Sequence, residues 1–106
     1  MDPGEVRKAA NESLFREVNE RIEDISVNAA FTQFICECRD QTCDERVSMT
    51  IQEYEHVRAE PNRFVVLPGH NASDVDEVVE ETDRYLVIRK TGSGEQVAEH
   101  MDPRSR

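Results

Sequence analysis

The stretch FICECRDQTCDERV, residues 34–47, holds all three cysteines of this 106-residue chain. Apolar and β-branched residues flank the cysteines on both sides, which predicts two strands joined by a loop that folds back on itself. Such a loop can point the sulfurs of Cys36, Cys38 and Cys43 at one centre. Because a domain of this size often needs a metal or crosslink to be stable, this stretch constrains the fold more than any other.

Three thiolates leave one position of a zinc tetrahedron open, and structural zinc sites are closed by a fourth protein ligand, commonly histidine. His70 is the best candidate, because it follows the Pro68-Gly69 turn at the end of an apolar strand. We expect His56, on a polar helix, and His100, in the C-terminal segment, to be surface histidines. The zinc ligands predicted from the sequence are therefore Cys36, Cys38, Cys43 and His70.

Nearby acidic residues offer other ways to complete the site. Glu37, Asp40 or Asp44 can each supply an oxygen ligand, although Asp40 and Asp44 are also typical turn residues that shape a loop. Glu37 lies between two ligands in an extended segment and should point away from them. A zinc ion held by three thiolates and a water, with His70 as general base, would instead be catalytic and also stays open.

The cysteine cluster can also be interpreted without zinc. Reduced, buried thiols and redox or disulfide chemistry remain alternatives, although clustered cysteines in an intracellular chain more often bind metal than crosslink. The odd cysteine count argues against a closed disulfide framework. An iron–sulfur cluster is disfavoured, because three thiolates fall one short of the usual four.

The charge balance limits the partners. The net charge is −10, from 23 acidic and 13 basic residues, which disfavours nucleic acid and favours a protein partner with a basic face. Binding to DNA or RNA would need a basic patch assembled from Arg58, Arg63, Arg84, Arg89 and Lys90. No apolar run approaches the roughly 18 residues of a membrane span, and the N-terminus lacks a signal-peptide pattern, so we expect a cytoplasmic protein with no membrane association.

Hydrophobic periodicity predicts two helices. The first begins at Asp2-Pro3 and continues for about 20 residues, with an apolar stripe of Phe15, Val18, Ile22 and Ile25. We expect this stripe to pack on the sheet of the same chain, and its heptad spacing also permits a homodimer through the helix. The second helix begins at a capping box, Thr50 to Glu53, and ends before Pro61.

Alternating and continuous apolar runs predict the strands, at residues 31–36, 47–51, 63–67, 75–81 and 85–90. The run 63–67 is apolar on both faces and should be central. The segment 71–82 can also form a helical turn, but we favour a hairpin between 75–81 and 85–90. The predicted fold is a single zinc-stabilised α+β domain over residues 1–92: a long N-terminal helix on a small, mostly antiparallel sheet, a short middle helix and a zinc-ribbon-like metal loop. Residues 93–106 should be a polar, flexible tail.

Three motifs together resemble a bacterial protein family. They are the CEC pair with the third cysteine, the EYxxVR helix motif at 53–58, and the RFxVxPGH motif at 63–70 that ends a strand. Over residues 14–90 this pattern resembles a family of short proteins and domains common in actinobacteria and related bacteria. The resemblance implies that Cys36, Cys38, Cys43 and His70 serve one site, and it supplies no biochemical activity.

Taken together, these patterns predict a small acidic, non-enzymatic zinc protein that acts as a protein-interaction or regulatory module. A redox thiol switch, in which oxidation releases zinc, is the first alternative. A zinc-dependent hydrolase is the second.

Overall fold

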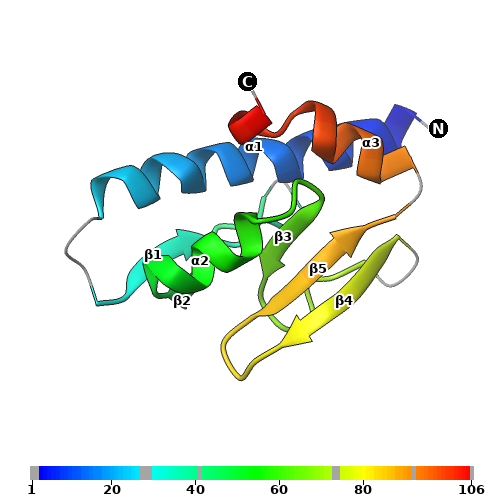
Figure 1. The fold of residues 1–106 in the computed structure, drawn as a ribbon. Helices are drawn as coiled ribbons and strands as arrows, with labels where there is room; N and C mark the ends of the chain where they lie inside the picture. Colours follow the sequence, from blue (N-terminus) through cyan, green and yellow to red (C-terminus); the bar gives the residue numbers. More distant parts are fainter. Residues whose placement is uncertain (1–2, 27–29, 41, 73–74, 92, 106) are drawn as a thin grey trace.

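The computed structural model describes residues 3–26, 30–40, 42–72, 75–91 and 93–105. Figure 1 shows a long helix lying along one side of two small sheets. The elements in chain order are α1 (Pro3–Ile25), β1 (Thr32–Ile35), β2 (Arg46–Met49), α2 (Ile51–Arg58), β3 (Arg63–Val66), β4 (Asp76–Glu81), β5 (Leu86–Lys90), α3 (Ser93–His100) and the short 3-10 helix η1 (Pro103–Ser105). The predicted α+β class is confirmed.

The strands form two antiparallel sheets where the sequence predicts one. β1 pairs with β2, and the other three strands have the order β3-β5-β4, so the favoured β4–β5 hairpin is confirmed. The prediction that β3 is central was wrong, because β5 is the central strand of this sheet and β3 lies at its edge. β3 is nevertheless buried in the core, and the segment just after β1 lies along its edge, where the Glu37 backbone N–H donates to the Val65 carbonyl at 2.8 Å.

The core lies between the sheets and the short helix α2. The capping box predicted at its start is present, since the Thr50 hydroxyl accepts from the Glu53 backbone N–H and the Glu53 carboxylate accepts from the Thr50 backbone N–H. This orientation buries Tyr54 and Val57. The Tyr54 ring stacks on Phe34 of β1 with the ring centroids 4.4 Å apart, so α2 is packed directly against the strand that leads into the cysteines.

Helix α1 packs on the rest of the domain through polar side chains. Glu12, Arg16 and Asn19 are almost fully buried, whereas Val18 is 39% and Ile25 is 83% exposed. The prediction that the apolar stripe packs on the sheet was therefore wrong for these two positions. Among the other members of the stripe, Ile22 packs against the core and Phe15 is half-buried.

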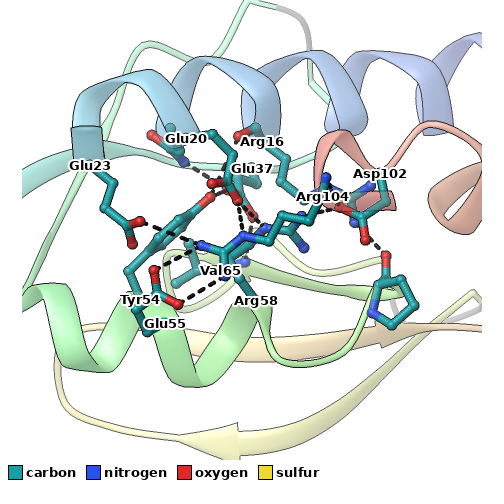
Figure 2. A network of polar contacts seen from close by, with 12 residues as sticks. Arg16, Glu20, Glu23, Glu37, Tyr54, Glu55, Arg58, Val65, Asp102 and Arg104 are labelled. Atoms are coloured by element: carbon teal, nitrogen blue, oxygen red, sulfur yellow. Dashed lines mark hydrogen bonds and ion pairs between the residues drawn. The ribbon is translucent and has the colours of Figure 1, made fainter. Parts of the chain in front are cut away.

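Arg16 shows how this polar face is accommodated. Its guanidinium donates hydrogen bonds to the carbonyls of Pro61 (2.5 Å) and Ala98 (2.7 Å) and lies 4.4 Å from the centroid of the Phe64 ring. Figure 2 shows Arg16 within a layer of charged and polar groups between α1, α2 and the C-terminal segment. Buried polar groups are tolerated only when such partners satisfy them, so this helix depends on directional contacts.

The C-terminal segment belongs to the fold. The sequence predicts a flexible tail after residue 92, but α3 packs beside α1 and Ala98 is buried. The Asp102 carboxylate pairs with the buried Arg58 guanidinium, and Arg104 bonds to Glu20 at 2.8 Å. The sequence does not reveal these contacts, because the polar residues of this segment find ion-pair partners that only the folded chain brings near. Among the described residues, no helix is both long and apolar enough to cross a membrane.

Candidate metal centre

The structure brings together the four residues that the sequence singles out. The ligand atoms of Cys36, Cys38, Cys43 and His70 all lie within 4.8 Å of one another. The His70 Nδ1 atom is 3.6 Å from the Cys36 sulfur and 3.7 Å from the Cys43 sulfur. A zinc ion at tetrahedral angles, with usual bond lengths to nitrogen and sulfur, would hold such a pair about 3.6 Å apart. The cluster can therefore hold a metal ion.

The cysteine positions follow from the end of the β1–β2 hairpin. The Cys36 backbone N–H donates to the Glu45 carbonyl at 3.1 Å, which extends the ladder by one step beyond β1. The Asp40 carboxylate accepts from the Thr42 backbone N–H and hydroxyl, at 2.9 and 2.6 Å. The Cys43 N–H donates to the Asp40 carbonyl, which closes the turn. The loop thus returns Cys43 to the side where Cys36 and Cys38 begin it.

His70 reaches the cluster through a tight turn after β3. The His70 backbone N–H donates to the Leu67 carbonyl at 3.0 Å, and Gly69 has a φ of 87°. Proline at the second and a positive-φ glycine at the third position are the features of a type II turn. A Cβ at Gly69 would meet nothing within 4 Å, so the positive φ is what favours glycine there.

The sulfurs lie in an environment suited to a bound cation. Cys36 and Cys38 are buried, Cys43 is half-buried, and all three are free thiols. The Leu67 backbone N–H donates to the Cys36 sulfur at 3.3 Å. Hydrogen bonding from the Cys36 thiol, helped by His70, lowers the pKa of Cys38 to about 5, whereas the same hydrogen bond raises the pKa of Cys36. One thiolate is thus already favoured before a metal arrives, and a cation would stabilise the other two.

Glu37 points away from the cluster, as its place between two ligands predicts. Its side chain is fully buried, and its carboxylate accepts from the Asn19 amide (2.8 Å), the Tyr54 hydroxyl (3.0 Å) and the Val65 backbone N–H (3.0 Å). Burial raises the pKa of Glu37, and the nearby Arg16 opposes that rise. Its oxygens are therefore engaged in the core and do not serve as metal ligands.

The structure does not bring the other candidate ligands into this group. His56 is exposed on α2 and lies 2.9 Å from Glu80 on β4. His100 is the exposed last residue of α3. The Asp40 carboxylate accepts a hydrogen bond from the Thr42 hydroxyl, which is typical of a turn residue. Asp44 is an exposed loop residue outside the group of four.

Sequence reasoning missed the buried polar residues that hold the backbone next to the candidate ligands. Asn19 on α1 is one, because its amide contacts Glu37 and the backbone of Ile35. The signal was present as a second stripe with the same four- and three-residue spacing as the apolar one, formed by Glu12, Arg16, Asn19 and Glu23. Polar residues at that spacing are usually solvated, which is why the apolar stripe is the expected packing face.

Carboxylates engage most of the basic residues that a nucleic-acid surface would need. Arg58, Arg84, Arg89 and Lys90 each form an ion pair with at least one acidic side chain. Arg58 and Lys90 are also buried. These four side chains therefore do not form an open basic patch.

Comparison of the chain with protein-family models, with curated proteins and with solved structures found no match.

Proposed function

We propose that this chain is a small acidic zinc-binding protein with a structural site of Cys36, Cys38, Cys43 and His70. The observation that carries the proposal is the spacing of the imidazole nitrogen, 3.6 and 3.7 Å from two sulfurs that lie on either side of the loop. Three thiolates and an imidazole suit zinc better than a hard cation, and a set of three cysteines and one histidine is typical of structural zinc sites. The metal would then contribute folding free energy to the domain.

The proposed role is that of an interaction or regulatory module. Four protein ligands fill a zinc tetrahedron and leave no position for the water that a hydrolase needs. The buried carboxylate of Glu37, which lies between two ligands in the sequence, is committed to three core donors. A net charge of −10 supports a protein partner with a basic face. We also propose, from the combined cysteine, EYxxVR and PGH motifs, that the chain belongs with the short bacterial proteins that it resembles, and that it acts in the cytoplasm.

A thiol switch at the same residues is the second candidate, because three free sulfurs lie within 4.8 Å of one another. Hydrogen peroxide would take two electrons from a pair of thiols, which form a disulfide as the peroxide becomes two water molecules. Because the disulfide removes two of the four ligands, the bound metal would dissociate. Metal and thiol counts that stay unchanged under mild peroxide would rule this candidate out.

The test of the zinc site is elemental mass spectrometry of the purified protein, with free thiols counted in parallel. We expect one zinc per chain, and loss of zinc in the variants His70→Ala and Cys38→Ser. His56→Ala is the matched control, because it removes an exposed histidine from α2. Protein prepared without chelator that holds no metal, or a His70→Ala variant that keeps it, would contradict the proposal.

A further inference from the structure

Glu37 connects the candidate metal loop to the interior of the domain. Because successive side chains of an extended segment point to opposite sides, Cys36 and Cys38 face the cluster while Glu37 faces the core. The three groups that donate to its carboxylate come from three elements: Asn19 from α1, Tyr54 from α2 and Val65 from β3. One side chain between two ligands therefore contacts three separate elements of the fold.

Asn19 fastens α1 to the strand that carries the ligands. Its amide nitrogen donates to the Ile35 carbonyl and to the Glu37 carboxylate, both at 2.8 Å, and its amide oxygen accepts from the Ile35 backbone N–H at 2.8 Å. Ile35 and Glu37 lie on either side of Cys36. A shift of the loop backbone would therefore break all three contacts together.

Helix α1 is held against the domain mainly by directional polar contacts, so such a shift of the loop would weaken its docking. Its fully buried side chains among the described residues are polar, and Ile22 adds only a partly buried apolar contact, whereas Leu14 is 55% and Ile25 is 83% exposed. Hydrogen bonds and ion pairs weaken steeply with distance and angle, whereas apolar packing is less directional. The β3–β5–β4 sheet, in contrast, is held by apolar packing, since Phe64 of β3 and Ile88 of β5 are buried in the hydrophobic core.

We propose that metal binding at the cysteine–histidine cluster controls the docking of α1, with Glu37 as the positioning residue that couples them. This inference rests on the proposed metal site. Ligation fixes the backbone on both sides of Glu37 and so holds its carboxylate where Asn19 and Tyr54 reach it. Loss of the metal frees that backbone, and α1 loses an anchor that its exposed apolar residues do not replace. Because coupling between two sites is reciprocal, weakening the α1 contact must also weaken metal binding.

The first test measures zinc affinity by competition with a chromogenic chelator. Asn19→Ala removes a side chain that touches no proposed ligand, and we expect it to weaken zinc binding about 10- to 100-fold, as loss of an outer-shell partner does. Asp24→Ala, an exposed change on the same helix, should leave the affinity unchanged. Ile88→Ala lowers the stability of the β5 core without touching Glu37, so an equal loss of affinity in that variant would overturn the coupling.

The second test follows hydrogen exchange in the zinc-loaded protein. Glu37→Gln keeps the size of the side chain but places an amide donor among groups that themselves donate. We expect amides of α1 to exchange at least tenfold faster in this variant while those of β5 change little. Glu45→Gln makes the same chemical change at an exposed position of the loop and should match the wild type.

The two proposals fail in different ways. If the protein binds one zinc but Asn19→Ala keeps full affinity and α1 keeps its protection in Glu37→Gln, the coupling is refuted and the structural site stands. If the wild-type protein binds no zinc, the site and the coupling are both refuted.

Discussion

Tyr54→Phe tests whether the buried Glu37 carboxylate depends on its donors. The hydroxyl of Tyr54, on α2, donates to the Glu37 carboxylate at 3.0 Å, and its other acceptor, the Arg16 backbone carbonyl, is more distant at 3.5 Å. Phenylalanine keeps the ring that stacks on Phe34 with an 11° angle between the ring planes. The substitution therefore removes one hydrogen bond and preserves the packing.

The expected loss follows from the charge and burial of the acceptor. A hydrogen bond to a charged group contributes about 1.5–3 kcal/mol, and the Glu37 side chain that loses this donor is fully buried. The Asn19 and Val65 donors remain, so we expect about 2 kcal/mol. With a urea m-value of roughly 2 kcal/mol/M for a domain of this size, the unfolding midpoint should fall by about 1 M.

Tyr85→Phe is the matched control. The Tyr85 hydroxyl also donates to a carboxylate, Glu53, at 3.2 Å, but the Glu53 side chain is 27% exposed and Arg84 holds it as well. We expect a loss of about 0.5 kcal/mol, typical of a hydrogen bond to a group that water can reach. Urea unfolding in excess zinc, followed by circular dichroism, measures both variants. Equal losses in the two would show that Glu37 does not depend on its buried donors.

Two further predictions concern buried charges away from the cluster. Asp102→Ala should cost about 3 kcal/mol in urea unfolding, because Arg58 stays buried with only Glu20 as its described ion-pair partner; a change under 0.5 kcal/mol would mean that the C-terminal segment is not part of the stable fold. Burial raises the pKa of Glu12 from 4.5 to about 8 against the opposing effect of Lys90. The folded state therefore holds the extra proton, and this carboxyl makes stability fall as the pH rises from about 4.5 to 8. Glu12→Gln should remove that fall, so its stability relative to wild type should rise between pH 5 and pH 8, and a constant difference would contradict the shifted pKa.

Local chemistry explains what could be predicted from the sequence. The capping box at Thr50, the turn made by Pro68 and Gly69, and the turn residue Asp40 each depend on neighbours within a few positions. The hairpin that carries Cys36 and Cys43 is local in the same sense. The grouping of His70 with the cysteines is a longer-range prediction, and it holds because the segment after β1 lies beside β3, where the Glu37 N–H donates to the Val65 carbonyl, and the turn after β3 leads to His70.

Only the tertiary structure decided which face of α1 is buried. The sequence offers two stripes of equal spacing, and transfer free energy alone favours burying the apolar one. The polar stripe is buried because Pro61, Glu37, Lys90 and the C-terminal segment supply acceptors and countercharges for it. Those partners lie tens of residues away in the chain, so no local pattern reveals them.

The same distinction between local and long-range interactions applies to the four candidate ligands and to the residues that hold them in place. The sequence by itself determined the four candidate ligands, because ligand chemistry is carried by the residue type and its spacing. The role of Glu37, the position of β5 between β3 and β4, and the folded C-terminal segment depended on the tertiary structure. A hydrogen bond or ion pair stabilises a protein only when both partners are brought together and withdrawn from water, and the complete fold decides which pairs meet.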